Sequence, residues 1–202
     1  MREKGFVYID EAVPGILWDA KYAGSDNFMG RPADGYCVNR TVCTIEAARA
    51  LKTAQSKAHD KGLELFVFDA YRPDRAVRDF CRWAEDASDT KRKTVHYPNV
   101  DKSELIPQGY IASRSGHSRG STIDLTLCRA DGTLLDMATV FDFMDLRSHH
   151  GAAGLLKEQE ENRELLRGIM LASGFTDYDC EWWHYRLAEE PYPHTYFDFV
   201  ID

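Results

Sequence analysis

The sequence predicts an α+β fold, with a mostly antiparallel central sheet and three main helices packed against it. Hairpin signals cluster in the second half of the chain, and the clearest is the pair Asp131-Gly132. Strand and helix patterns do not alternate regularly enough for a doubly wound sheet. The chain has 202 residues with no linker, repeat or low-complexity segment, so one domain over residues 1–202 is expected.

Helical signals mark three segments, at residues 44–61, 73–87 and 155–173. Thr44 can cap the first of these helices, and Gly62 ends it. The second begins at Pro73, because proline suits a first helical turn. Gly174 closes the third helix, whose apolar face is weak in its first half.

Apolar runs bounded by turn residues predict short strands at 6–9, 16–18, 63–69, 110–112, 123–127, 133–135, 175–178 and 181–187. Segments 21–36 and 88–108 are polar and are expected to be loops. Long ordered loops are often functional, so Tyr22 and Tyr36 are candidates for lining a pocket, although both could be ordinary half-buried aromatics. The tail, 191–202, is expected to wrap the surface with its rings tucked in.

Composition restricts the partners. There are 25 basic and 33 acidic residues, a net charge of −8, which argues against a broad surface for nucleic acid or an anionic membrane. The five cysteines include no Cys-x-x-Cys pair, which favours buried free thiols in a reducing compartment. The start of the chain, 1–6, lacks a secretion signal, and no apolar run could span a membrane. A cytoplasmic location is therefore expected, and the oligomeric state stays open.

Two histidines stand out among the seven in the chain. His117 lies in a polar turn and Asp124 begins the apolar run after it, while His184 follows Glu181 by three residues. Two imidazoles and one carboxylate make a three-ligand zinc site with an open fourth position for water. We therefore expect His117, Asp124 and His184 to hold one zinc ion, and a carboxylate that does not bind the metal to move protons beside it.

The spacing of Glu181 and His184 sets a structural condition. Residues three apart share a face on a helix but point to opposite sides of a regular strand, and Trp182 and Trp183 favour a strand. A bulge, a strand end or a twist is therefore expected there, to bring both side chains toward the metal. An amphipathic aromatic strand with no chemical role is the alternative.

Arg72 is held at a strand-to-helix corner, because Pro73 forces the residue before it into an extended backbone. A side chain at such a corner can be aimed into a cleft. The alternative is a surface arginine that pairs with Asp69 or Asp74.

Two motifs resemble those of the zinc D,D-peptidases that share a fold with hedgehog signalling domains. They are Ser115-x-His117-x-x-Gly120-x-Thr122-x-Asp124 and Glu181-Trp182-Trp183-His184-Tyr185. Further stretches extend the match, namely Trp18-Asp19-Ala20-Lys21-Tyr22, Asp26-Asn27-Phe28, Asp69-Ala70-Tyr71-Arg72-Pro73, Phe141-Asp142-Phe143-Met144-Asp145 and Ser148-His149-His150. Together they resemble the VanX-type D-alanyl-D-alanine dipeptidases across nearly the whole chain. Thr122 stands where that family usually has alanine, and Gly116 where a serine is familiar.

The resemblance implies a zinc enzyme that cleaves free D-Ala-D-Ala, a small dipeptide substrate. It makes His117, Asp124 and His184 the ligands of one zinc ion, Glu181 the general base and acid, and Arg72 the group that stabilises the oxyanion. Substrate-holding positions would be Tyr22, Ser115 and Asp142, with Asp142 on the ammonium and Ser115 on the carboxylate. The implied role is glycopeptide resistance or D-Ala catabolism.

Two other functions fit part of this pattern. A D,D-carboxypeptidase that trims muramyl peptides would use the same chemistry in an open cleft. A non-catalytic zinc-binding domain would use the metal only for stability, but it would need neither Glu181 nor Arg72.

Overall fold

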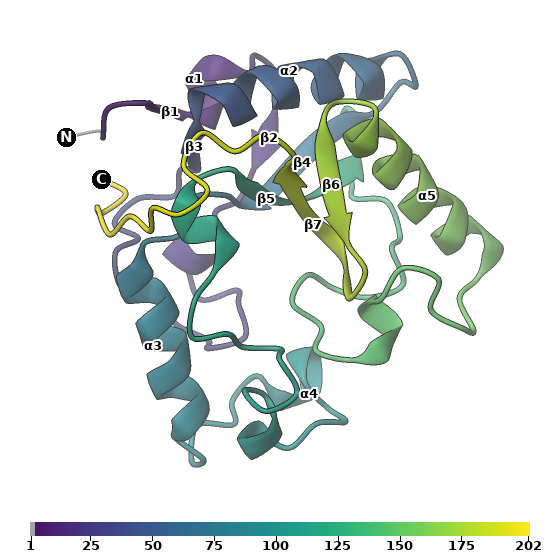
Figure 1. Cartoon of the computed structure of the whole chain (residues 1–202). Helices are drawn as coiled ribbons and strands as arrows, with labels where there is room; N and C mark the ends of the chain where they lie inside the picture. Colours follow the sequence, from purple (N-terminus) through teal and green to yellow (C-terminus); the bar gives the residue numbers. More distant parts are fainter. Residues whose placement is uncertain (1–2) are drawn as a thin grey trace.

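The computed structural model describes residues 3–202, so residues 1 and 2 of the expected domain lie outside it. Its main sheet has five strands in the order β2-β4-β5-β7-β6 (Figure 1). These are β2 (Leu17–Trp18), β4 (Glu64–Asp69), β5 (Thr122–Cys128), β7 (Glu181–Leu187) and β6 (Phe175–Tyr178). Only β2 and β4 run parallel, which confirms the predicted α+β fold with a mostly antiparallel sheet.

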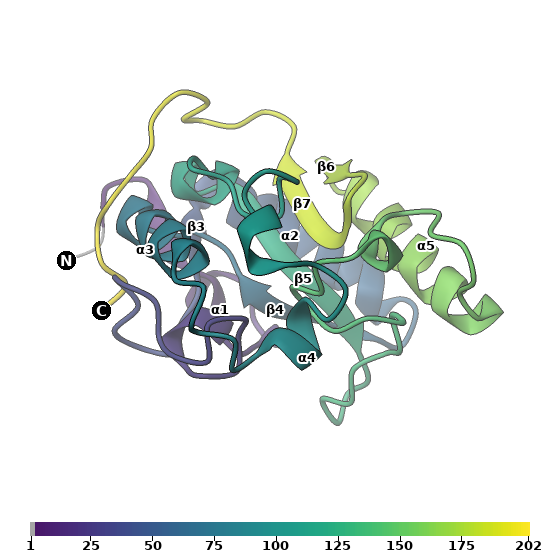
Figure 2. The same cartoon turned by 90° about the horizontal axis from the view of Figure 1, so that it is seen from below.

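A smaller antiparallel sheet joins β1 (Phe6–Tyr8) to β3 (Val42–Thr44). The first residues of the chain therefore pair with the strand that leads into the first long helix. The C-terminal tail covers this region, because the Phe6 ring packs against the rings of Tyr192, Phe197 and Phe199. Figure 2 shows the tail running along one side of the molecule, and the expectation that its rings are tucked in is confirmed.

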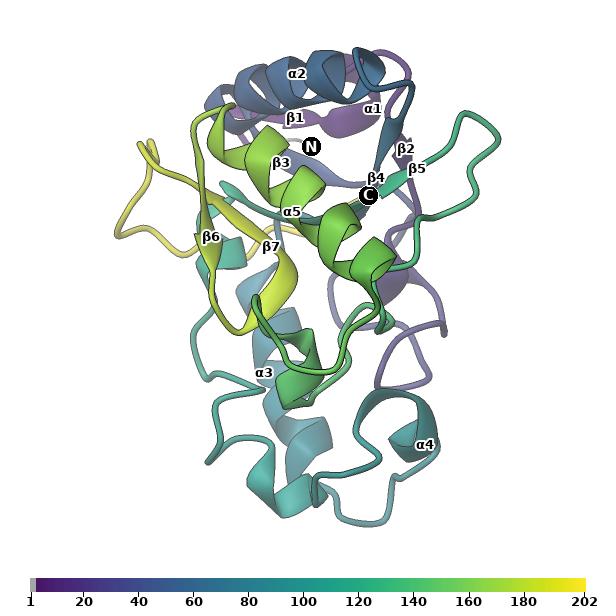
Figure 3. The ribbon, with the colours of Figure 1, turned by 90° about the vertical axis from the view of Figure 1, so that its right-hand side faces the viewer.

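The three predicted helices are present as α2 (Ile45–His59), α3 (Asp74–Glu85) and α5 (Lys157–Leu171). Thr44 caps α2 by accepting a hydrogen bond from the backbone N–H of Ala47 at 3.3 Å. In Figure 3, α2 and α5 lie together over the sheet, while α3 lies at the opposite end of the molecule. Through Phe80, α3 packs against the rings of Tyr22 and Phe28.

Several predictions of local structure were wrong. Residues 110–112 form a bend rather than a strand, and the hairpin at Asp131-Gly132 pairs only Cys128 with Leu134. β3 and a set of short helices were not predicted from the sequence. These helices are α1 (Ile9–Ala12), α4 (Lys93–His96), η1 (Lys21–Ala23), η2 (Lys102–Glu104), η3 (Gly116–Arg119) and η4 (Leu146–Ser148). Elements of three or four residues carry too little periodicity to be recognised.

Within residues 3–202, no helix combines the length and the apolar character that crossing a bilayer requires. All five cysteines are free, but only Cys43 and Cys128 are buried, so the expectation of buried thiols was wrong for the other three.

Candidate metal centre and active-site pocket

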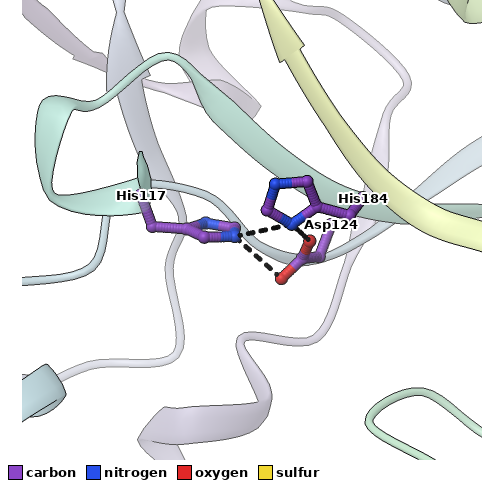
Figure 4. Close-up of side chains that lie close together, drawn as sticks. All are labelled: His117, Asp124 and His184. Atoms are coloured by element: carbon purple, nitrogen blue, oxygen red, sulfur yellow. Dashed lines mark hydrogen bonds and ion pairs between the residues drawn. The ribbon is translucent and has the colours of Figure 1, made fainter. Parts of the chain in front are cut away.

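His117, Asp124 and His184 meet at one point although they are far apart in sequence (Figure 4). Asp124 on β5 lies directly opposite His184 on β7 in the strand register, and η3 brings His117 to the same place. The Nε2 atom of His117 is 3.2 Å from Asp124 Oδ2 and 3.3 Å from His184 Nδ1. His184 Nδ1 is 3.1 Å from Asp124 Oδ1. One ligand atom from each residue therefore lies within 4.8 Å of the other two.

The donor atoms of this cluster suit a divalent cation. His117 Nδ1 lies 2.7 Å from the carbonyl oxygen of Ala70, which can only accept, so Nδ1 carries the proton and Nε2 presents a lone pair. A histidine that donates from its other nitrogen to a carbonyl is the usual arrangement at a metal. Oδ1 of Asp124 is buried and accepts no hydrogen bond from any residue between 3 and 202. Lone pairs of the three side chains therefore point at the same place, with too few protons between them to form hydrogen bonds. A metal ion bound there would accept these lone pairs.

The surroundings favour the metal-binding form of two of the three groups, which are neutral His117 and ionised Asp124. Burial lowers the pKa of His117 and favours the neutral imidazole. Burial opposes ionisation of Asp124, but the two imidazoles beside it outweigh burial and lower its pKa. His184 is different, because the negative charge of the adjacent Asp124 carboxylate outweighs the effect of burial and raises the pKa of His184. A cation bound here would displace that proton from His184.

Glu181 lies beside the cluster, with its Oε2 atom 3.4 Å from His184 Nδ1. The predicted irregularity is present, because the register between β6 and β7 shifts between Asp177 and Tyr178, where Tyr178 pairs with Glu181. Burial raises the pKa of Glu181. Its carboxylate therefore faces the same space as the histidines without belonging to the converging set.

Arg72 reaches the cluster from the corner after β4. Its Nε is 3.0 Å and its Nη2 2.9 Å from Asp69 Oδ2, and Nη2 is also 3.4 Å from Asp124 Oδ2. Arg72 does pair with Asp69, as the alternative expected. The pair does not lie on the surface, because the Arg72 side chain is only 12% exposed. Nη1 has no hydrogen-bond partner within residues 3–202, and Arg72 lines the pocket.

The cluster opens into a cavity of about 240 Å³, which is small for a ligand site. Tyr22, Ser115 and Asp142 all line it, as do Glu181 and the three clustered residues. The hydroxyl of Tyr22 donates to Asp142 Oδ2 at 2.6 Å. Burial raises the pKa of Asp142 well above its usual value. The cavity therefore has a half-buried carboxyl group on its wall in addition to the cluster.

Tyr36 does not line this pocket, so that expectation was wrong. Its buried hydroxyl donates to Asp69 Oδ1 at 2.7 Å, behind Arg72. Asp69 in turn lies 3.7 Å from His117 Nδ1, whereas it was expected only as a possible partner of Arg72. The signal that could have found it is its position at the end of an apolar strand, three residues before Arg72. Other pocket residues that were missed include Tyr110, Arg114, Tyr178, Cys180 and Trp183.

The two departures from the family pattern lie together. A Cβ atom on Gly116 would come 3.1 Å from the hydroxyl oxygen of Thr122, and this oxygen is buried without a hydrogen-bond partner among residues 3–202. A larger residue at 116 would therefore crowd a threonine at 122, and glycine relieves this contact.

Comparison with known proteins decides the family. The family model described as D-ala-D-ala dipeptidase matches residues 2–202. The chain belongs to this family. As a family member it is a peptidase, and it is similar over nearly its full length to proteins named D-alanyl-D-alanine dipeptidase. The identity is 52% over 200 residues with that of Enterococcus faecium, covering 98% of this chain and 99% of the relative.

Other members of the family also match most of the chain. The Streptomyces coelicolor dipeptidase is 51% identical over 197 residues, covering 97% of this chain and 98% of the relative. The Escherichia coli dipeptidase is 34% identical over 183 residues, covering 90% and 84%.

Proposed function

We propose that this chain hydrolyses free D-alanyl-D-alanine to two molecules of D-alanine, with a zinc ion held by His117, Asp124 and His184. The observation that carries the proposal is the convergence of these three side chains on one point of a cavity of only about 240 Å³. The name shared by the relatives supports the choice of substrate.

Zinc is a metal that suits this donor set. Two imidazole nitrogens and one carboxylate oxygen are typical of catalytic zinc, in which a fourth position stays open. A zinc ion bound by these three residues would act as a Lewis acid and would lower the pKa of a water molecule to about 7.

Glu181 handles the protons in this proposal. Its carboxylate lies next to the cluster and within the cavity, so it can take a proton from the attacking water as the oxygen bonds to the peptide carbon. The same proton then passes to the leaving nitrogen as the C–N bond breaks. Water thus adds across the peptide bond, and Glu181 returns to its starting form.

Arg72 stabilises the developing negative charge on the peptide oxygen. Asp69 fixes the guanidinium and leaves Nη1 without a protein partner within residues 3–202, so the cation is already oriented when charge develops.

Replacing Arg72 by lysine is expected to lower kcat by about 10²–10³-fold, because lysine keeps the charge but lacks the planar fork. Steady-state kinetics with metal analysis test this. Arg75→Lys is the matched control, since Arg75 pairs with Asp198 at 3.0 Å on the outer side of α3 and does not line the cavity. An Arg72→Lys protein that keeps wild-type kcat and its metal would remove Arg72 from the mechanism.

The two ends of the substrate meet different groups. Asp142, held by Tyr22, pairs with the ammonium, and the hydroxyl of Ser115 reaches the carboxylate. A peptide that is extended at its amino end has no ammonium for Asp142 and too much volume for the cavity.

The experiment that tests the proposed function compares D-Ala-D-Ala with N-acetyl-D-Ala-D-Ala, using zinc-loaded protein. We expect turnover of the free dipeptide and a kcat/KM for the acetylated one lower by at least about 100-fold, since Asp142 then has no ammonium partner in the substrate. Equal turnover of both substrates would favour a D,D-carboxypeptidase. A zinc-loaded protein that cleaves neither would favour a non-catalytic zinc-binding domain.

The proposal includes a cytoplasmic location, which the five unpaired cysteines support. The biological role would be removal of free D-Ala-D-Ala, for glycopeptide resistance or for D-Ala catabolism, without a nucleic-acid or membrane partner.

A further inference from the structure

One wall of the cavity is a segment with little regular structure. Residues 137–149, here called the wall segment, contain only the short helix η4 and supply Asp142, Phe143 and Met144 to the cavity. Within residues 3–202, the only two non-glycine residues with positive φ are Ala138, at 69°, and Asp142, at 57°. Both lie in this segment. Such angles are uncommon for residues with a Cβ atom, although aspartate adopts them more readily than most. Contacts from outside the wall segment therefore help to hold it in this conformation.

Arg163 on α5 contacts both ends of the wall segment. Its Nε and Nη2 donate to the carbonyl oxygen of Met137 at 2.8 and 2.6 Å. Nη2 also donates to the carbonyl of Arg147 at 2.9 Å, and Nη1 to that of His149 at 3.1 Å. One planar guanidinium thus joins the first residue of the segment to two residues near its end. Only arginine has enough donors in a fixed fork to make these bonds together.

The environment of Arg163 is unusual for an arginine. The residue is only 2% exposed, and no carboxylate of residues 3–202 lies within 4 Å of its nitrogens, so backbone carbonyls surround its charge. The ring of Trp182 lies 5.8 Å from Cζ. Burial lowers the pKa of Arg163 to about 10, which leaves it charged at neutral pH. A buried cation without a counter-ion is costly, and here the hydrogen bonds to three backbone carbonyl groups offset that cost.

The centre of the wall segment is held separately. His96 accepts a hydrogen bond at its carbonyl from the N–H of Met144 at 2.7 Å, and its Nδ1 lies 3.2 Å from the carbonyl oxygen of Asp142. His96 therefore fixes the middle, while Arg163 fixes the ends.

We propose that Arg163 is a positioning residue that keeps Asp142 directed into the cavity by tying the two ends of the wall segment together. This inference rests on the proposed function, in which Asp142 holds the ammonium of the dipeptide. None of the three clustered residues belongs to the wall segment, since His117, Asp124 and His184 come from η3, β5 and β7. Loss of Arg163 should therefore weaken substrate binding without removing the metal.

The test compares Arg163→Met with Arg167→Met. Arg167 lies one turn further along α5 and pairs with Asp177 of β6 at 2.6 Å, so it is a matched arginine that does not touch the wall segment. We expect Arg163→Met to raise KM for D-Ala-D-Ala by about 10–100-fold with a small change in kcat, because the ammonium is bound equally before and during the reaction. Arg167→Met should keep the wild-type KM, and both variants should bind one zinc ion per chain.

Hydrogen exchange supplies a readout that general destabilisation would not give. Amides of residues 137–149 should exchange faster in Arg163→Met while those of β5 and β7 keep their protection. Uniformly faster exchange, or a KM equal to that of Arg167→Met, would overturn the inference.

If Arg163→Met does not fold, the Arg163→Lys variant tests the inference instead, because lysine keeps the charge but cannot donate to three carbonyl groups at once. A raised KM in a folded Arg163→Lys protein supports the inference, and a wild-type KM overturns it. Failure of the wild-type protein to cleave D-Ala-D-Ala would instead contradict the proposed function.

Discussion

Replacing Glu181 by glutamine is expected to lower kcat by about 10²–10⁴-fold while the protein keeps its metal. Glutamine has the size of glutamate and can still form hydrogen bonds in the cavity, but it cannot take a proton from water or deliver one to the leaving amine. The three clustered residues are untouched, so elemental analysis should still give one zinc ion per chain. Steady-state kinetics on D-Ala-D-Ala together with that analysis make the measurement.

Glu189→Gln is the control for this variant, because Glu189 is an exposed carboxylate in the turn after β7 and does not line the cavity. It should behave as the wild type. The decisive comparison is between two zinc-loaded proteins. If the Glu181→Gln protein turns over at the wild-type rate, the proton must move through another group, and the proposed function loses its general base.

The parts of this molecule that could be predicted from the sequence are those with a local cause. Thr44 caps a helix because its side chain reaches a backbone N–H three residues on, and this needs no knowledge of the rest of the fold. The spacing of Glu181 and His184 likewise required an irregular strand, and the register between β6 and β7 shifts at that point. His117 and Asp124 could be singled out as candidates because each has its own local context.

What could not be predicted depends on contacts between distant segments. Tyr36 was expected at a pocket, but its hydroxyl is directed to Asp69, and no local pattern fixes that choice. The weak apolar face in the first half of the third helix has the same kind of cause. In α5, Gln159, Asn162 and Arg163 all donate to residues 136–149, while Leu156, just before the helix, is 66% exposed. Polar residues face inward there because they bind a loop, which hydrophobic periodicity alone cannot reveal.

Removing the metal with a chelator is expected to abolish hydrolysis of D-Ala-D-Ala, and added Zn²⁺ should restore it. The protein should also lose stability. The candidate ligands come from η3, β5 and β7, so a bound cation links a turn to two neighbouring strands, and it binds the folded state alone. At a free metal concentration on the order of 1,000 times the dissociation constant, binding adds about 4 kcal/mol to the free energy of unfolding. For a chain of this size each kcal/mol corresponds to about 2–4 °C in Tm.

Two histidine variants separate the metal centre from other histidine–carboxylate pairs. His117→Ala should bind no stoichiometric zinc, lack activity and show no Tm response to the chelator. His59→Ala is the matched control, because His59 pairs with Glu64 on the exposed side of α2 and belongs to no cluster of metal-binding residues found within residues 3–202. It should keep one zinc ion, full activity and the full Tm response. The contrast follows from geometry: a single histidine beside a carboxylate offers too few lone pairs for a metal, whereas at Asp124 two imidazoles are directed at one carboxylate. Hydrolysis that persists in protein verified to be free of metal would contradict this account of the site.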